Sequence, residues 1–380
     1  MNIKVISIVL AITSLFSILV VSVSADGFVI DEQIPSAILI ELETGTVLYE
    51  KDADTQRQPA SVTKIMTMLL IMEAIDSGKI SMDEIVTVSA YASSMGGSQV
   101  YLKEGEQMSV EDMLKSITVA SANDACVAMA EHIAGSEESF VSLMNNRAAE
   151  LGMANTNFEN TNGLDDTTMS HYTTARDIAI MSRELLKHER IIDFSSIWMD
   201  SIRNGEFGLT NTNRLIRFYK GANGLKTGST SKAGFCISAT AERDGMTLIC
   251  VIMGAPTRDV RNEAAKKALD YGFANYALYT AQGCDYNEFP VKRGAEKTCN
   301  LKSDGFVYLA EKGSIADISF DTQLPEVINA PVMAGDTVGK IVYTLGGQAI
   351  GEVEIKAADD VKEITYVGML EELIKKFLLI

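Results

Sequence analysis

A serine and a lysine stand three residues apart at the start of a long apolar segment. Residues 61–64 read S-V-T-K, and residues 65–72 read I-M-T-M-L-L-I-M. On a helix, positions i and i+3 lie on one face, so the Lys64 amine can reach the Ser61 hydroxyl. A serine hydroxyl becomes an effective nucleophile once a neighbouring group takes its proton. Lysine can take it in the neutral form, which apolar surroundings and a second cation both favour. The pair therefore predicts a nucleophilic serine with a lysine base.

The spacing of these two residues is a weak signal when taken alone. Ser229 and Lys232 share it, and about one or two such matches arise by chance in a chain of this length. A serine that follows Pro59 also suits a helix N-cap. In that alternative the Lys64 ammonium would simply extend outward to water.

Two further triplets strengthen the chemical interpretation. S-A-N at 121–123 begins a second apolar helical segment, and Lys226-Thr227-Gly228 lies on the first of three expected strands. The order S-x-x-K, S-x-N, K-T-G in these contexts resembles the penicillin-recognising serine acyl transferases. S-A-N is close to the S-G-N of the low-molecular-mass D-alanyl-D-alanine carboxypeptidases. The resemblance continues in N-G-L-D, H-Y-T-T-A-R-D and M-G-A-P-T-R-D-V-R, at residues 162–165, 171–177 and 253–261.

The resemblance implies a role for each residue of the three elements. Ser61 is the expected nucleophile, Lys64 the expected base, and Ser121 would pass the proton on to the leaving amine. Asn123 would hold the substrate amide and Lys64. The backbone N–H groups of Ser61, at a helix N-terminus, and of Ser229 would bind the oxyanion. Ser229 also stands where some family members carry a histidine, which bears on substrate preference.

A terminal carboxylate on the substrate needs cationic and hydroxyl-bearing partners. Lys226 and Thr227 supply one of each, and Arg261, the last residue of G-A-P-T-R-D-V-R, is the expected third partner. Arg258 is the competing choice, and an ordinary surface arginine is the alternative for either. Lys226 is also the candidate second cation near Lys64.

The elements that position these residues follow from side-chain periodicity. Residues 36–51 alternate apolar and polar side chains around E-T-G at 43–45, which predicts a hairpin. Helical periods follow, notably over 81–149 and 174–188. Three strands and a helix are then expected at 224–230, 234–242, 246–254 and 262–278. This order predicts one α/β domain with an antiparallel sheet over residues 26–279. The resemblance implies a β-lactamase/transpeptidase-like fold with a helical subdomain.

The C-terminal part has a different composition. Short strands and turn residues at 284–363 predict a small all-β domain with no cluster that could do chemistry. Residues 366–380 predict an amphipathic helix whose apolar face carries Met369, Leu370, Leu373, Ile374, Phe377 and Leu378. The resemblance implies that this helix lies in the membrane interface. Its polar face balances two Glu with two Lys, so binding would rest on apolar burial. Docking against the β-rich domain and a dimer contact are the alternatives.

Residues 1–25 have the pattern of a secretory signal. Lys4 precedes an unbroken apolar and hydroxyl run, and V-S-A at 23–25 offers small residues for cleavage after Ala25. An uncleaved anchor helix is the alternative. Either interpretation places the rest of the chain outside the cytoplasm, on the outer face of the cytoplasmic membrane or secreted.

Composition excludes several other classes of protein. At 47% apolar and 22% charged, the 380 residues suit folded material, and a net charge of -18 without basic runs argues against nucleic acid. Five cysteines without C-x-x-C, and no H-E-x-x-H, indicate neither a disulfide scaffold nor a zinc site. Three histidines, none in a catalytic context, disfavour a Ser-His-Asp triad, and His171 is expected to be structural. No metal or organic cofactor is implied.

Cys236 and Cys250 flank an expected two-residue turn at Asp244-Gly245. In a hairpin with such a loop, two residues face each other when their residue numbers add to an odd number. The numbers of Cys236 and Cys250 add to an even number, so the two thiols would face opposite sides of the sheet. We expect no disulfide between them.

These observations predict an exported serine-type D-Ala-D-Ala carboxypeptidase that acts on peptidoglycan stem peptides and is inhibited by β-lactams, whose strained amide mimics the scissile bond. A D,D-endopeptidase would use identical chemistry. A class A β-lactamase would need a carboxylate for deacylation, usually in E-x-x-L-N, which the chain lacks. A catalytically silent wall-binding protein is disfavoured by the intact triplets.

Overall fold

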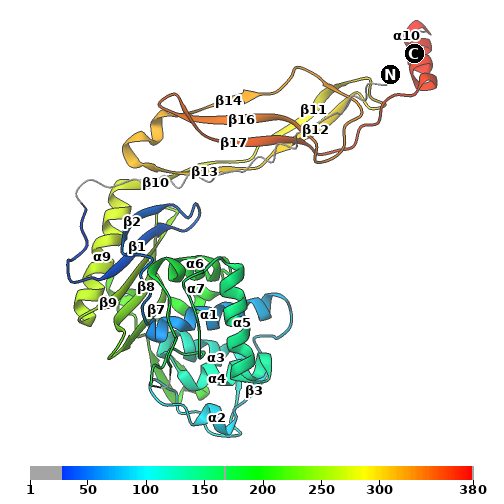
Figure 1. Cartoon of the computed structure of the whole chain (residues 1–380). Helices are drawn as coiled ribbons and strands as arrows, with labels where there is room; N and C mark the ends of the chain where they lie inside the picture. Colours follow the sequence, from blue (N-terminus) through cyan, green and yellow to red (C-terminus); the bar gives the residue numbers. More distant parts are fainter. Residues whose placement is uncertain (1–27, 167, 379–380) are drawn as a thin grey trace, which may run out of the picture.

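The computed structural model of the chain describes residues 28–166 and 168–378, so the expected signal segment lies outside the described residues. A five-stranded sheet in the order β2-β1-β9-β8-β7 forms the centre of the first domain, and each neighbouring pair is antiparallel (Figure 1). Its strands are β1 (Ser36–Glu41), β2 (Val47–Lys51), β7 (Ala222–Thr230), β8 (Gly234–Arg243) and β9 (Met246–Ala255). The predicted hairpin and the three consecutive strands are confirmed.

Two hydrophobic cores cover the two faces of this sheet. Alternate residues of β1 divide between them, with Ile38 in one core and Leu39 in the other, as the two-residue period of a strand requires. Helix α9 covers one face (Figure 1). The helical subdomain covers the other, with its larger helices at α1 (Lys64–Asp76), α4 (Asn123–Ala134), α5 (Glu137–Glu150) and α6 (Ala175–Leu185).

The turn between β8 and β9 confirms the expected cysteine geometry. Arg243 pairs with Met246 across the two-residue loop. Cys236 belongs to the core under the helical subdomain, and Cys250 belongs to the core under α9. All five cysteines are free, so the prediction of no disulfide between these two is confirmed.

Helix α9 (Arg258–Asn275) differs at both ends from the predicted helix at 262–278. It begins earlier because the Thr257 side chain caps it by accepting the Val260 N–H. It ends earlier because residues from Tyr276 onward form β10 (Tyr276–Ala281), which pairs with β13 (Phe306–Glu311). The prediction was wrong there because the segment's apolar pattern also suits a strand whose partner lies far along the chain.

The helical subdomain also contains short strands and turns. Its remaining elements are β3 (Ile85–Thr87), α2 (Ala90–Ser93), β4 (Gln107–Ser109), α3 (Val110–Lys115), the π-helical η2 (Ser116–Ala120), α7 (Ile191–Ser195), β5 (Met199–Ile202), η3 (Arg203–Gly205), β6 (Phe207–Thr210) and α8 (Leu215–Phe218). Strands β3 and β4 pair, and so do β5 and β6. Strand β3 packs against α4, and β6 packs against η2.

The second domain is built from strands, as predicted. Its six-stranded sheet has the order β14-β16-β17-β12-β11-β15. The strands are β11 (Asp285–Lys292), β12 (Thr298–Ser303), β14 (Ile318–Gln323), β15 (Ile328–Asn329), β16 (Thr337–Leu345) and β17 (Gln348–Ala357), with the 3-10 turn η4 (Lys312–Asp317). Leu345 pairs with Gln348 across the expected Gly346-Gly347 turn.

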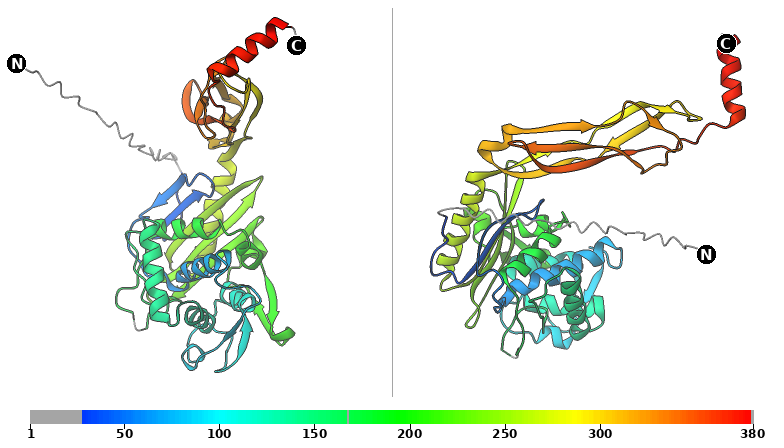
Figure 2. Two further views of the ribbon diagram at one scale, coloured as in Figure 1. Left: turned by 90° about the vertical axis from the view of Figure 1, so that its right-hand side faces the viewer. Right: turned by 45° about the horizontal axis from the view of Figure 1, so that its top comes forward.

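Helix α10 (Tyr366–Leu378) lies at the end of the β-rich domain that is farther from the first domain (Figure 2). Its apolar side chains are exposed, for example Leu373 and Phe377. This exposure does not fit docking against the β-rich domain. Within residues 28–166 and 168–378, no helix is both long and apolar enough to cross a membrane.

Candidate active site

Ser61 lies in a 3-10 turn, η1 (Ala60–Thr63), that leads directly into α1. Thr63 Oγ1 donates to the Ala60 carbonyl at 2.8 Å and contacts His171 Nε2 at 2.8 Å. His171 Nδ1 accepts the Glu159 N–H at 3.1 Å, so the proton of the neutral ring is on Nε2. Burial lowers the His171 pKa to about 4. His171 therefore supports the turn that carries the serine, which agrees with its expected structural role.

Lys64 is fully buried and its Nζ makes three hydrogen bonds. It donates to Asn123 Oδ1 at 2.7 Å, to the Asn162 carbonyl at 2.7 Å and to Ser61 Oγ at 2.9 Å. The Asn123 Oδ1 and Asn162 carbonyl oxygens can only accept, whereas the Ser61 hydroxyl can also donate. In the neutral amine, two N–H groups therefore stay with Asn123 and Asn162, and the lone pair is left for the Ser61 proton.

Burial lowers the Lys64 pKa from 10.5 to about 8, and the nearby Cys126 and Asp124 oppose the shift. Burial also lowers the Lys226 pKa well below 10.5, with Lys64 as the next largest cause. Lys226, the expected second cation, is not among the causes of the Lys64 shift, so the charge effect between the two lysines is seen only on Lys226. Burial is nevertheless the main reason that Lys64 approaches the neutral form.

Ser121 and Lys226 lie on the walls that face the η1 turn. Ser121 joins η2 to α4 in a left-handed conformation, with φ 63, and its buried Oγ has no hydrogen-bond partner among the described residues. Lys226 on β7 is buried, and its Nζ donates to the Thr227 carbonyl at 3.0 Å. Burying a hydroxyl without a hydrogen-bond partner costs free energy. A hydroxyl left unpaired in a cavity is typical of a group whose partner is a substrate.

Gly228 allows β7 to approach the serine turn. A Cβ on this residue would lie 2.7 Å from the Ser61 nitrogen and 2.8 Å from the Val62 nitrogen. The third residue of K-T-G must therefore be glycine for steric reasons. The same close approach brings Ser229, the next residue, to the cavity beside Ser61.

A cavity of about 640 Å³ opens above Ser61. Its lining residues are Ser61, Ser98, Ser121, Trp198, Thr210, Asn211, Thr212, Arg214, Phe218, Thr227, Gly228, Ser229, Arg258 and Arg261. Of the predicted site residues, six line it directly, while Lys64, Asn123 and Lys226 are buried and are not part of the lining. The sequence interpretation missed Arg214 and Trp198, because nothing local marks them.

Both candidate arginines reach this cavity, but their environments differ. Arg261 is 2% exposed, and its guanidinium donates to Asn262 Oδ1 at 2.8 Å and to the Cys236 carbonyl at 3.3 Å. Burial lowers the Arg261 pKa to about 10, and Arg258 contributes in the same direction. Arg258 is exposed. The buried Arg261 is therefore better fixed for carboxylate binding.

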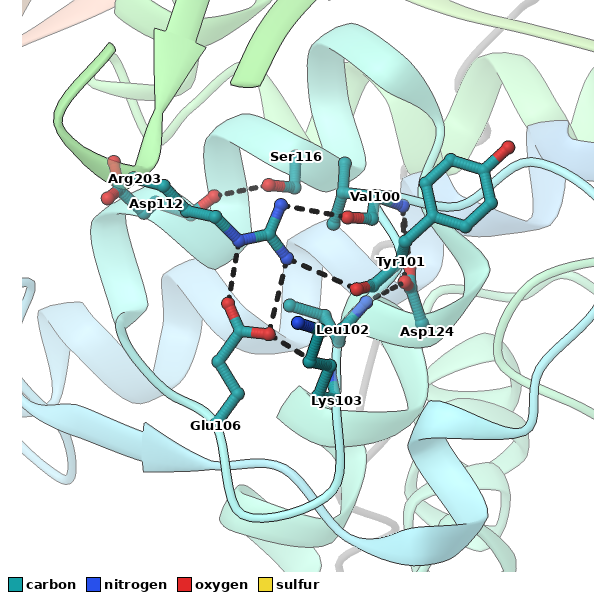
Figure 3. A network of polar contacts seen from close by, with 9 residues as sticks. All are labelled: Val100, Tyr101, Leu102, Lys103, Glu106, Asp112, Ser116, Asp124 and Arg203. Carbon is teal, nitrogen blue, oxygen red and sulfur yellow. Dashed lines mark hydrogen bonds and ion pairs between the residues drawn. The ribbon is translucent and has the colours of Figure 1, made fainter. Parts of the chain in front are cut away.

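A polar network fixes the loop that borders the site (Figure 3). Arg203 donates to Glu106 at 2.7 Å and to the Val100 carbonyl at 2.9 Å. Asp124 accepts the N–H groups of Val100 and Leu102. The loop is also tied to the catalytic region, because the Asn123 backbone N–H donates to the Ser98 carbonyl at 2.7 Å. Local sequence patterns do not predict these long-range contacts.

The comparisons with known proteins agree with this geometry. Residues 22–257 match the family described as D-alanyl-D-alanine carboxypeptidase. The chain belongs to this family. Residues 277–363 match the penicillin-binding protein 5 C-terminal domain. As a member of the D-alanyl-D-alanine carboxypeptidase family, the chain is a serine peptidase and a low-molecular-mass penicillin-binding protein, which confirms the predicted family, enzyme class and fold.

Curated relatives match over most of their length. The D-alanyl-D-alanine carboxypeptidase DacF of Bacillus subtilis (strain 168) is 44% identical over 343 residues, which are 88% of each chain. DacA of Escherichia coli (strain K12) is 32% identical over 383 residues, which are 96% of this chain and 94% of the relative. The likeness therefore spans both domains.

Solved structures give the same result. Penicillin binding protein 5 from Haemophilus influenzae aligns with a TM-score of 0.76 at 31% identity, covering 89% of this chain and 100% of that chain. Penicillin-binding protein D2 from Listeria monocytogenes, solved in an ampicillin-bound form, aligns with a TM-score of 0.59 at 32% identity, covering 63% and 98%.

Proposed function

We propose that this carboxypeptidase releases the terminal D-alanine of peptidoglycan stem peptides through an acyl-enzyme formed on Ser61. The environment of Lys64 carries the proposal. Burial lowers the pKa of this lysine to about 8, and the acceptors on Asn123 and Asn162 direct the amine lone pair toward Ser61 Oγ, 2.9 Å away. A neutral amine in this position is a competent base for the serine.

The reaction follows from this arrangement. Lys64 takes the Ser61 proton as Oγ bonds to the carbonyl carbon between the two D-alanines. The backbone N–H groups of Ser61 and Ser229 stabilise the oxyanion. Ser121 then passes the proton to the leaving nitrogen, the C–N bond breaks, and D-alanine departs. Water adds to the acyl carbon and gives a proton to Lys64. The ester bond to Oγ then breaks, Lys64 returns the proton to Oγ, and the shortened peptide leaves with a free carboxyl group.

Recognition of the substrate's end is assigned to the wall opposite Ser121. Thr227 lines the cavity, and Arg261 is held in a fixed orientation by Asn262 and by the Cys236 carbonyl. Both can bind the terminal carboxylate, and the buried Lys226 supports this strand by donating to the Thr227 carbonyl at 3.0 Å. Asn123 holds Lys64, while its side-chain nitrogen donates to the Gly96 carbonyl at 2.7 Å, so its expected contact with the substrate amide stays a prediction. β-Lactams would acylate the same Ser61, in keeping with the ampicillin-bound Listeria relative.

The purified chain, incubated with diacetyl-Lys-D-Ala-D-Ala and with a fluorescent penicillin, tests this proposal. We expect D-alanine release together with stable penicillin labelling, and both should be lost in Ser61→Ala with little change in melting temperature. Rapid penicillin turnover would instead indicate a β-lactamase. Absence of labelling and of D-alanine release would indicate a silent wall-binding protein. Faster cleavage of cross-linked muropeptide dimers than of monomers would indicate an endopeptidase.

We further propose that the chain is exported and binds the outer face of the cytoplasmic membrane through α10. The exposed apolar side chains of this helix, including Leu373 and Phe377, support interfacial binding by apolar burial. Flotation with phosphatidylcholine vesicles tests the membrane step, with and without phosphatidylglycerol.

Equal binding to both kinds of vesicle is expected, because the polar face carries balanced charge. Leu373→Glu combined with Phe377→Glu should abolish flotation, and Lys375→Gln on the polar face is the matched control. Failure of the wild-type protein to float, with a molar mass that doubles as concentration rises, would indicate the dimer alternative.

A further inference from the structure

The catalytic cavity is strongly cationic in a strongly acidic chain. The chain carries a formal net charge of -18, yet the cavity is lined by Arg214, Arg258 and Arg261 and by no Asp or Glu among the described residues. One terminal carboxylate is matched by one fixed guanidinium, which Arg261 provides. Two lining arginines are therefore left without a role in binding the end of the substrate.

Arg214 and Arg258 are also unpaired within the described part of the chain. Both are exposed, and neither guanidinium makes a hydrogen bond or ion pair with any residue that the structure describes. Other arginines of this domain are paired, for example Arg147 with Glu73 and Arg176 with Asp54. The cations at the cavity are thus available to a ligand.

The position of Arg258 runs against helix electrostatics. It is the first residue of the 18-residue helix α9, and Arg261 follows one turn later. The N-terminus of a helix favours anions, so cations there are locally unfavourable. Asp259 in the same turn partly offsets this charge but does not line the cavity, so the two arginine side chains and the helix N-terminus present positive potential there. A local electrostatic cost of this kind is expected at functional positions.

An apolar surface completes the same rim. The rings of Trp198 and Phe218 line the cavity with centroids 6.0 Å apart, and Phe218 is 65% exposed. Arg217 lies over both rings, at 5.7 Å from each centroid. The rim can therefore pack the aliphatic stem of a long side chain while the nearby arginines bind an anionic end.

We propose that Arg214 and Arg258 form a second anion subsite that selects stem peptides with a free carboxylate on the side chain of the residue preceding D-Ala-D-Ala. This inference rests on the proposed carboxypeptidase function and names its preferred substrate class. The side chain of diaminopimelate ends in a carboxylate beside an ammonium group, whereas a lysine side chain ends in an ammonium group alone, which the two arginines repel.

Three peptides of matched backbone test the subsite: Nα-acetyl-Lys-D-Ala-D-Ala bearing a free, an acetylated or a succinylated side-chain amine. They present a cation, a neutral group and an anion. We expect kcat/KM to rise in that order, with the anionic peptide about 5- to 30-fold above the neutral one, as for a charge-assisted contact at a partly exposed site. Salt should reduce this ratio.

Variants assign the effect to residues. In the double variant Arg214→Gln with Arg258→Gln, kcat/KM for the anionic peptide should fall to within about twofold of kcat/KM for the neutral peptide. Lysine replacements should restore part of it, because they keep the charge. Arg190→Gln, at an exposed arginine that does not line the cavity, is the control for loss of a positive charge elsewhere on the surface and should keep the wild-type ratio.

A binding measurement separates this proposal from the carboxypeptidase function itself. Trp198 is the only tryptophan of the chain, so its fluorescence reports cavity occupancy in Ser61→Ala without turnover. Tighter binding of the anionic peptide, lost in the double glutamine variant, supports the subsite even if no D-alanine is released. Equal kcat/KM and equal binding for all three peptides would refute the subsite, while D-alanine release would still support the carboxypeptidase function.

Discussion

Replacing Asn123 by aspartate tests the role of Lys64 through a nearly isosteric change. The Asn123 Oδ1 atom accepts a hydrogen bond from Lys64 Nζ at 2.7 Å, so the substitution puts a negative charge against the base. An opposite charge at this distance stabilises the ammonium form and raises its pKa by about 1–3 units. The Lys64 pKa should therefore rise from about 8 to about 9–11.

The size of the effect on rate follows from the fraction of neutral amine. With a pKa of about 8, roughly one Lys64 in eleven is neutral at pH 7. A rise of about two units leaves roughly one in a thousand, so acylation at pH 7 should slow about 100-fold. Because the neutral form is active, the rate rises with pH and levels off above the pKa.

Lys64 is the group expected to dominate titration between pH 7 and 9. Its Nζ contacts the Ser61 Oγ at 2.9 Å, and burial raises the pKa of the neighbouring Cys126 to about 12. Stopped-flow acylation by a fluorescent penicillin, followed from pH 6 to 10, measures the profile. The wild-type midpoint should lie near 8, and that of Asn123→Asp one to three units higher.

Asn123→Ala is the control, because it removes the hydrogen bond without adding charge. Its rate should be lower at every pH, with a midpoint at or below that of the wild type. An Asn123→Asp profile that keeps the wild-type midpoint would refute Lys64 as the titrating base.

Three further predictions concern the framework of the site. Gly163→Ala should destabilise the protein by several kcal/mol and slow acylation, because the new Cβ would lie 1.9 Å from the Ala60 carbonyl oxygen. Gly152→Ala is the control, because Gly152 has a similar positive φ but open space around it. It should lower the free energy of unfolding in urea by only about 1–2 kcal/mol. Gly228→Ala should slow acylation but lower the melting temperature less than Gly163→Ala does. An acylation rate equal to that of the wild type would contradict the close approach of β7 to Ser61. The hydrogen bond from Arg203 lowers the Glu106 pKa, so the pair stabilises the fold above the ordinary glutamate pKa and loses this contribution as pH falls. Urea unfolding of Glu106→Gln should therefore show less loss of stability on acidification, by about 1 kcal/mol or less.

The catalytic residues were predictable because their chemistry is tied to short spacings. Ser61 and Lys64 are one turn apart, and Gly228 follows Lys226 within a strand, so local geometry fixes what each can reach. The Asn162 carbonyl could not be recognised as a partner of Lys64, because any residue supplies a carbonyl and only the fold selects one. The N-G-L-D segment that contains Asn162 carries a signal only through the family resemblance.

Long-range contacts account for the other differences. The end of α9 was misplaced because pairing with β13, rather than local propensity, turns the chain at Tyr276 into a strand. Arg214 and Trp198 approach Ser61 only through the loops that follow β6 and precede β5. Nothing in their neighbourhood distinguishes them from surface residues.

The covalent intermediate tests the central claim most directly. The purified chain is mixed with penicillin, quenched in acid, and analysed by intact mass and by peptide mapping. We expect a single penicilloyl adduct on Ser61, formed with a pH midpoint near 8 and absent from Ser61→Ala. An adduct on Ser121 or Ser229, or an adduct that persists in Ser61→Ala, would contradict it.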